Sequence, residues 1–107
     1  MPPIPFLPQV YLNTCKASTP QQKIHLAVQL TVQYFNDVSR NPGYCVDYNL
    51  HPNNMYTFVL QDILSTERIY FVYRIRNTAK ICVRVHTLFK KKLRELQQRI
   101  TDAELTE

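Results

Sequence analysis

Glycine is almost missing from this chain, since Gly43 is the only one in 107 residues. Loops that hold the phosphates of a nucleotide need several glycines, because only glycine lets the backbone approach a phosphate so closely. The composition therefore argues against a dinucleotide fingerprint, a phosphate loop and a kinase-type lid. We expect no nucleotide-dependent chemistry.

Cysteines are few and scattered, and none of them forms a C-x-x-C pair. The histidines are equally dispersed. A secreted disulfide framework or a zinc site would show closer and more regular spacings. We therefore expect reduced thiols, an intracellular protein and no bound metal. The residues concerned are Cys15, Cys45, Cys82, His25, His51 and His86.

Long apolar runs are missing too, and none approaches the roughly 18 residues that a membrane helix needs. The opening "MPPIPFLPQVYL" has no basic region and too many prolines for a signal peptide. We expect a protein of the nucleus, the cytoplasm or both, without membrane contact.

Paired acidic residues, which general acid–base catalysis uses, are not found at any regular spacing. The acidic residues that stand far apart in the chain are Asp37, Asp47, Asp62 and Glu67. Cys45 with His51 or His86 could form a thiol–imidazole pair, but chance explains their co-occurrence better. We predict a non-enzymatic protein with no catalytic residues, no cofactor and no small-molecule substrate.

What the chain does have is a modest positive charge, with 13 Lys and Arg against 8 Asp and Glu. Its clearest basic cluster lies near the end, on one side of a predicted helix. Such a cluster is more often a solvated face than a phosphate groove, but it provides candidate contacts with RNA or with an acidic partner. These candidates are Lys90, Lys91, Lys92, Arg94 and Arg99.

The apolar patterns predict an α+β domain. The helix over "STPQQKIHLAVQLTVQYFNDVSR" has the clearest signals, with Thr19 as cap, Pro20 in the first turn and Gln22 completing a capping box. Two more helices are predicted over "HPNNMYTFVLQDIL", with Asn53 or Asn54 as cap, and "TLFKKKLRELQQRI". Strands are predicted over "QVYLNTC", "ERIYFVYRI" and "AKICVRV", the last two forming a hairpin, while "YCVDYNL" reads as a short extended segment.

This order, β-α-α-β-β-α, predicts a small antiparallel sheet with three amphipathic helices on one face. Residues 1–107 would form one domain, with residues 1–8 and 101–107 poorly ordered.

The stretch "ERIYFVYRI" has apolar residues on both faces of the predicted strand. One face is expected to pack under the helices, through Ile69, Phe71 and Tyr73 with Phe35, Phe58, Val59, Leu93 and Leu96. No helix is left to cover the other face, so we expect a second copy to pack sheet against sheet across a twofold axis. The alternative is that "PPIPFLP" folds back over the strand. The expected dimer face consists of Val10, Leu12, Tyr70, Val72 and Arg74.

The order of the predicted elements and several short stretches of the chain resemble the enhancer of rudimentary homolog family. The matching features are a long helix with a late tyrosine, "AVQLTVQYFND", an extended "VDYNL" and an aromatic short helix, "MYTFVLQDI". A strand ending in V-Y-R and a last helix with "LFKKKL" follow. The resemblance covers roughly residues 23–98. The chain lacks the tryptophan at the start of the last helix, so it resembles a divergent paralog.

The resemblance implies a homodimer joined through the sheets, acting as a non-enzymatic adaptor for short segments of partner proteins. It also implies a place in RNA processing, such as mRNA processing, removal of selected transcripts, or microRNA and piRNA maturation, with RNA bound indirectly. The alternative is a small basic module that binds RNA directly, because Tyr70, Phe71 and Tyr73 resemble stacking aromatics of RNA-recognition sheets. The chain has neither the βαββαβ order nor the glycine-containing motif of those domains.

Overall fold

The structure is a computed structural model, and it describes residues 6–16 and 19–105. Three helices and three antiparallel strands make up this part of the chain, which confirms the α+β class. The observed order is α-α-β-β-β-α, so the predicted order was wrong. The elements are α1 (Leu7–Thr14), α2 (Pro20–Phe35), β1 (Tyr44–His51), β2 (Met55–Asp62), β3 (Arg68–Arg74) and α3 (Ile81–Leu105).

Helix α2 forms where the sequence predicts it. The hydroxyl of Thr19 accepts a hydrogen bond from the backbone N–H of Gln22 at 3.1 Å, which satisfies one donor of the first turn. Pro20 stands at the start, where its missing N–H costs nothing. The helix buries one stripe, made of Ile24, Ala27, Val28, Thr31, Val32 and Phe35.

The segment predicted as a second helix is the middle strand, β2, and it pairs with both β1 and β3. Asn53 and Asn54, predicted as helix caps, instead form the β1–β2 turn with φ of 65° and 57°. Asparagine tolerates this left-handed region better than most residues. The family pattern places a short helix here, and the structure has a strand. The inward residues of β2 are Tyr56, Phe58 and Leu60, all buried.

The predicted first strand, "QVYLNTC", lies in α1 instead. Pro8 and Leu12 are buried on one side of this helix, which packs on α2 and α3. The side-chain oxygen of Gln9 accepts a hydrogen bond from the backbone N–H of Cys82 at 3.0 Å. Gln9 thus satisfies a free donor in the first turn of α3, and the two helices are joined at this point.

The stretch "AKICVRV" was predicted to be the second strand of a hairpin, and it opens α3 instead. Its β-branched residues favour strands, but the apolar spacing continues without a break into the rest of the helix. One buried stripe therefore runs along α3, formed by Ile81, Cys82, Val85, Phe89, Leu93 and Leu96.

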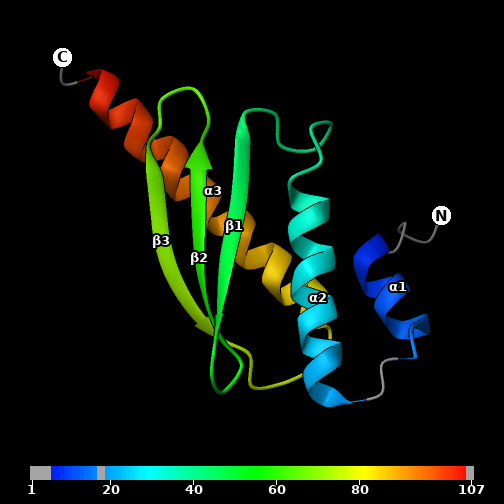
Figure 1. Cartoon of the computed structure of the whole chain (residues 1–107). Coiled ribbons are helices and arrows are strands. Elements are labelled where there is room, and N and C mark those ends of the chain that lie inside the picture. Colours follow the sequence, from blue (N-terminus) through cyan, green and yellow to red (C-terminus); the bar gives the residue numbers. More distant parts are fainter. Residues whose placement is uncertain (1–5, 17–18, 106–107) are drawn as a thin grey trace.

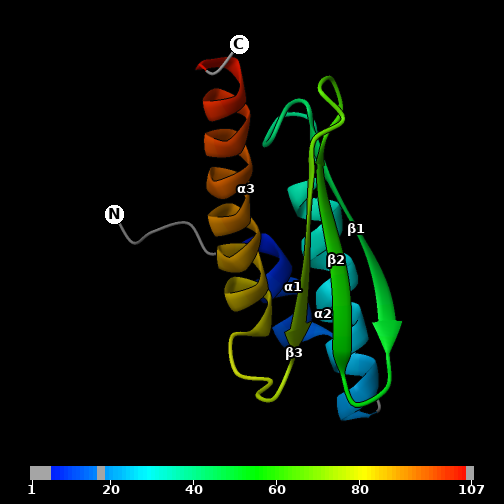
Figure 2. The same ribbon diagram turned by 90° about the vertical axis from the view of Figure 1, so that its left-hand side faces the viewer.

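The sheet has the order β1-β2-β3. Helix α3 crosses its inner face, while α2 runs beside β1 and α1 lies beyond α2 (Figure 1). Seen from the side, the sheet and α3 form two layers (Figure 2), and the molecule extends only 18 Å along its shortest axis. The prediction of three helices on one face is thus only partly right, because a single helix crosses that face.

The core lies between α3 and the inner face of the sheet, with Phe58 at its centre. The ring of Phe58 stands 5.0 Å from that of Phe89 and 5.3 Å from that of Phe71, between ring centroids. Such aromatic pairs add to the apolar area that they bury. All the described elements contribute to one buried cluster. Of the ends expected to be poorly ordered, residues 7–8 belong to α1 and 101–105 to α3; residues 1–5 and 106–107 lie outside the described part.

Candidate functional site

The outer face of the sheet is the side that turns away from α3. The strand pairing places four rows of three side chains on it. From one end of the sheet to the other the rows are Cys45–Gln61–Arg68, Asp47–Val59–Tyr70, Asn49–Thr57–Val72 and His51–Met55–Arg74. No helix among residues 6–16 and 19–105 packs on this face.

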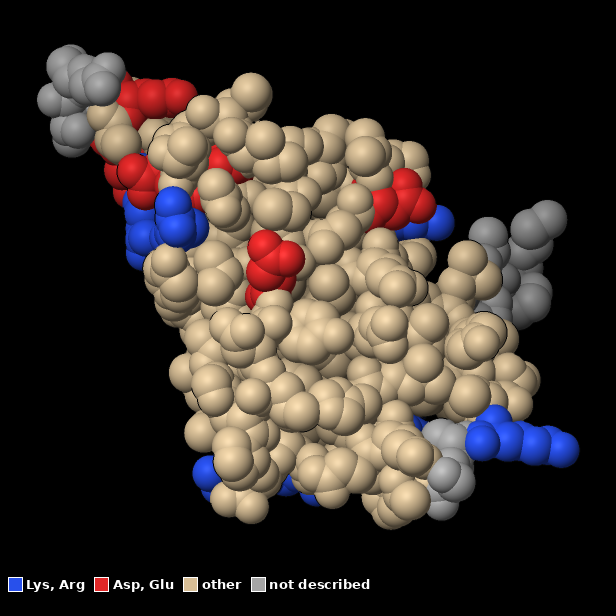
Figure 3. Space-filling model, in the orientation of Figure 1, with Lys and Arg blue, Asp and Glu red and all other residues tan. Residues whose placement is uncertain are grey.

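Apolar side chains on the outer face gather on β2 and β3. We call Met55, Val59, Tyr70 and Val72 the apolar strip. Tyr70 is 61% exposed and Val72 is 63% exposed, which is unusual for large apolar side chains side by side on one sheet. Figure 3 looks onto this side of the molecule, where Lys, Arg, Asp and Glu lie mainly around the rim.

The β1 side of the outer face is polar. It carries Asp47, Asn49 and His51, and the Nε2 of His51 lies 2.6 Å from the Oγ1 of Thr57 on β2. Asp47 is the only acidic residue among the twelve, whereas β3 contributes two arginines. The outer face is therefore asymmetric, with a polar, acidic margin along β1 and an apolar, basic margin along β3.

The predicted orientation of β3 agrees with the structure. Tyr70, Val72 and Arg74 are exposed on the outer face, while Ile69 and Phe71 are buried beneath it. Their role in a dimer stays a prediction.

Val59 was predicted to lie in the core, and this is wrong, because β2 turns it outward beside Tyr70. Met55 and Val59 were missed as surface residues because their segment was read as a helix. The signal that would have found them is the alternation of aromatic and smaller residues in "MYTFVL", directly after the turn-forming "PNN".

Val10 and Leu12 were predicted beside β3 on the dimer face, and this placement is also wrong. Both belong to α1, and Leu12 is only 1% exposed. Just before α1, the ring of Phe6 lies 4.7 Å from that of Tyr34 and 4.9 Å from that of His86, between centroids. Residues 6–14 thus lie against the helices, so this part of the leading segment does not cover the sheet. Residues 1–5 are outside the described part.

Three of the five basic residues predicted to contact RNA or an acidic partner make hydrogen bonds within the chain. Lys90 Nζ donates to the side-chain oxygen of Asn41 at 3.0 Å, and Lys92 pairs with a carboxylate one turn further along α3 at 3.2 Å. Arg99 donates to a backbone carbonyl of β3 at 3.1 Å. The other two, Lys91 and Arg94, are exposed and make no hydrogen bond or salt bridge with the described residues.

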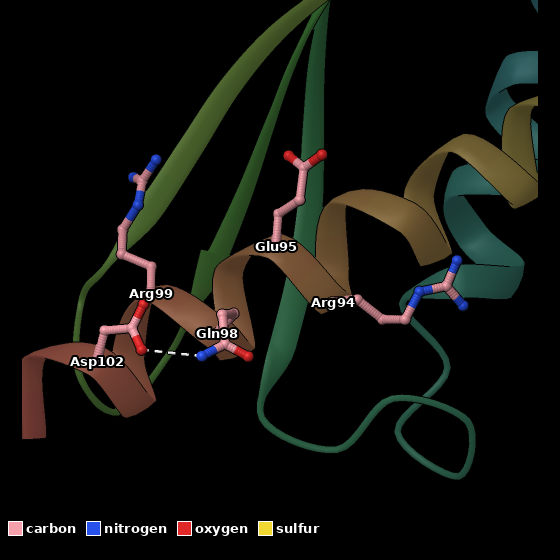
Figure 4. Close-up of a pocket in the computed structure, with 5 residues that line it drawn as sticks. All are labelled: Arg94, Glu95, Gln98, Arg99 and Asp102. Atoms are coloured by element: carbon pink, nitrogen blue, oxygen red, sulfur yellow. Dashed lines mark hydrogen bonds between the residues drawn. The ribbon is translucent and has the colours of Figure 1, made fainter. Parts of the chain in front are cut away.

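A surface hollow runs along the C-terminal half of α3, but it does not have the form of a ligand pocket. It is lined by five residues of this one helix, Arg94, Glu95, Gln98, Arg99 and Asp102. Their side chains spread outward instead of converging, and Gln98 donates to Asp102 at 2.8 Å (Figure 4). A small-molecule site encloses most of its ligand between several elements. This hollow gives no such enclosure.

Two titratable groups of the sheet, the thiol of Cys45 and the phenol of Tyr56, are held in their neutral forms. Burial, with the charge of Asp47 second, raises the pKa of the Cys45 thiol, which works against a reactive thiolate. Burial, and then Tyr48, raises the pKa of Tyr56 to about 12. Its hydroxyl lies 3.2 Å from the Nδ1 of His25 on α2, so this phenol links the sheet to the helix.

Among the described residues, the Nδ1 of half-buried His86 is the one buried side-chain nitrogen or oxygen without a hydrogen-bond partner. It stands between α3 and the aromatic rings of Phe6 and Tyr34. Burial lowers its pKa, and the nearby charges of Lys90 and Arg40 lower it further. A buried nitrogen without a hydrogen bond lowers the stability of the fold. It lies away from the outer face.

Comparisons with protein-family models, with curated proteins and with solved structures found no match to this chain. Within the described residues, no helix is long and apolar enough to cross a membrane, and no three side chains of metal-binding type cluster together. The outer face, with its apolar strip, is therefore the surface on which a function is best argued.

Proposed function

We propose that this protein is a non-enzymatic homodimeric scaffold, in which the outer faces of two copies pack together across a twofold axis. The observation that supports it most is the apolar strip, because Tyr70 and Val72 are more than half exposed on a face that no described element covers. Soluble monomers seldom leave such a strip open to water, and closed twofold dimers are the commonest cover.

The size of the sheet sets a condition on this dimer. Three strands about 4.8 Å apart and about 25 Å long give a footprint of roughly 350 Å². A standard stable interface covers about 800 Å² on each partner. The interface must therefore extend beyond the sheet, and the neighbouring surface is suited to this, since the broad side in Figure 3 carries most of its charge at the rim.

Charge favours one orientation of the two copies. If the twofold axis runs across the strands, β3 of one copy lies antiparallel over β3 of the other, so that Arg68 of one copy faces Arg74 of the other. If the axis runs along the strands, β1 of one copy lies over β3 of the other. This second arrangement brings Asp47 of one copy close to Arg68 of the other. Opposite charges at an interface fix its orientation, whereas like charges oppose it. The second arrangement is the one we propose.

The biological setting of the proposal comes from the resemblance to the enhancer of rudimentary homolog family. It suggests a scaffold in an RNA-processing complex, with small-RNA maturation or RNA decay as the specific settings. The partners would be short segments of other subunits, with RNA bound indirectly and with no cofactor or small-molecule substrate. A twofold dimer offers two equal docking sites at a fixed distance, so two copies of a partner gain avidity.

The test is the mass of the protein in solution, measured by size-exclusion chromatography with light scattering. Wild type is expected at twice the chain mass of 12.7 kDa at micromolar concentration. Val72→Arg is expected at the single-chain mass, because an unpaired guanidinium would be buried in the interface. Val83→Arg is the control, since Val83 is exposed on α3, on the other layer. A wild type that runs as a single chain contradicts the proposal.

Direct RNA binding is the second candidate, favoured by an exposed aromatic, Tyr70, between Arg68 and Arg74 on one strand. The basic residues of α3 belong to the other layer, however, so they do not extend this surface (Figure 2). RNA bound mainly through phosphates would dissociate steeply with rising salt, and a titration of single-stranded RNA at 50 to 200 mM salt (roughly the range over which such binding is lost) separates the two candidates.

A further inference from the structure

Strand β3 lies at the edge of the sheet, with β2 on one side only. The backbone N–H of Ile75 donates to Asn54 at 3.0 Å, so the odd-numbered residues of this strand direct their N–H and C=O groups to β2. The even-numbered residues therefore point theirs outward. Arg68 confirms this direction, because its carbonyl accepts a hydrogen bond at 3.1 Å from the side chain of Arg99, which does not belong to the sheet.

The outward groups of Tyr70, Val72 and Arg74 form a free edge. None of their backbone N–H or C=O groups has a hydrogen-bond partner among the described residues. Figure 2 looks onto this side of the molecule, where β3 lies in front of the other strands, with α3 in the neighbouring layer and no further strand of the described chain paired with its edge. Edges of this kind are the templates on which extended peptides add as a new strand.

The free edge has a strongly basic surround. Arg68 and Arg74 stand at its two ends, with side chains on the outer face, and Arg76 follows directly after the strand. Arg99 lies beside the start of β3 on the inner side. Glu67 is the only acidic residue in 67–76. The electrostatic field along this edge therefore favours an acidic occupant.

A second copy of the chain fits this edge poorly. If two β3 strands paired antiparallel over their full length, Arg68 of each copy would stand opposite Arg74 of the other. Like charges directly opposite each other across a strand pair are destabilising. This edge is thus better suited to a foreign segment than to self-association.

We propose that the free edge of β3 binds an extended, acidic segment of a partner protein as a fourth strand. Acidic residues of the segment lie opposite Arg68 and Arg74, and the apolar residues between them lie beside Tyr70 and Val72. This inference rests on the proposed scaffold function, and it names the chemistry and backbone geometry of the segment that the scaffold binds.

The probe is a fluorescent seven-residue peptide with glutamate at both ends and alternating threonine and valine between them, its termini blocked. Its binding to the full chain is followed by anisotropy. The control peptide has lysine in place of both glutamates. We expect the acidic peptide to bind more tightly than the lysine peptide. Its affinity should fall as salt is added.

Two variants at one position isolate the backbone. Val72→Ala and Val72→Pro both remove the branched side chain of valine, but only proline removes the outward N–H, and the β2 ladder does not use that group. Val72→Pro is expected to bind the acidic peptide about fivefold more weakly than Val72→Ala, or worse. Arg74→Glu is expected to lower the affinity for the acidic peptide about fivefold. Lys16→Glu is the control, because it makes the same charge change next to α1 and should leave this affinity unchanged.

Other results would overturn the inference. Equal affinity of the proline and alanine variants means that the backbone edge is not used, and equal binding of the lysine peptide means that charge does not select the segment. A smaller mass for Val72→Pro than for Val72→Ala means that a second copy occupies the edge. Displacement of the acidic peptide by single-stranded RNA means that phosphate is the preferred ligand.

The fourth strand and the dimer fail separately in these measurements. A dimeric wild type that binds neither peptide refutes the fourth strand and leaves the dimer standing. A wild type of single-chain mass that binds the acidic peptide refutes the dimer and supports the fourth strand. If arginines merely protect the edge from aggregation, neither peptide binds and the inference fails.

Discussion

Truncation of two neighbouring residues of β2 should lower the stability by very different amounts. Phe58 is fully buried against four aromatic rings, those of Tyr48, Tyr56, Phe71 and Phe89. Val59, the next residue, lies on the outer face. We expect Phe58→Ala to lower the free energy of unfolding by about 3–5 kcal/mol, because the ring leaves a cavity that the rigid core fills only partly. We expect Val59→Ala to lower it by about 0.5–1 kcal/mol.

Urea unfolding measures this difference. For a chain of this size the free energy falls by about 2 kcal/mol per molar urea, so Phe58→Ala should shift the midpoint by about 2 M and Val59→Ala by less than about 0.5 M. Each protein is measured at several concentrations, so that any contribution from association shows as a concentration-dependent midpoint.

Equal losses at the two positions would refute the placement of β2. On the helix that the sequence pattern suggests for this segment, Phe58 and Val59 share one apolar stripe, and both would be buried. A strand separates them by placing consecutive side chains on opposite faces. The ratio of the two losses is therefore a direct measure of the local structure.

Three smaller effects follow from single contacts. The lowered pKa of half-buried His86 should make stability fall as the pH drops below about 6.5, because the unfolded chain then takes up a proton that the folded chain does not. Above that pH the contribution of His86 should stay level. His86→Leu should reduce the difference between the urea midpoints at pH 7.5 and 5.5, and an unchanged difference would contradict this. Gln9→Ala should lower the free energy of unfolding by about 1 kcal/mol, or the melting temperature by about 4 °C in calorimetry, because the N–H of Cys82 loses its acceptor; Gln33→Ala on the exposed side of α2 is the control. Thr19→Ala should cost about 1 kcal/mol by losing the cap of α2, with Thr19→Asn restoring most of it.

The sequence was most informative where signals of different kinds coincided. Over Pro20–Phe35, a cap, a proline in the first turn and a helical stripe all agreed, and the helix is there. In β3, a run of β-branched and aromatic residues predicts the strand. The alternation of its side chains places Tyr70, Val72 and Arg74 on the outer face. In both elements the local signals were sufficient to predict the structure.

The errors fall where a local pattern fits two structures equally well. "MYTFVLQDI" fits a helical stripe and an alternating strand alike, and its pairing with strands on both sides decides for the strand. "AKICVRV" has strand propensity, but Val85 belongs to the buried stripe that continues through Phe89, so packing overrides it. Tertiary contacts thus decide both, and a single sequence does not display them.

The outer face and the free edge of β3 have separate roles in these proposals. The outer face would contact a second copy, and the free edge would bind a peptide. With the twofold axis along the strands, β1 of the second copy lies over β3, and α2, which runs beside β1, then lies over the space next to the free edge (Figure 1). A fourth strand added there would rest between β3 of one copy and α2 of the other. Dimerisation and peptide binding would then be linked, and each would change the affinity of the other by the same factor. The dimer would thus be part of the binding site, and each of the two sites would be built from both copies.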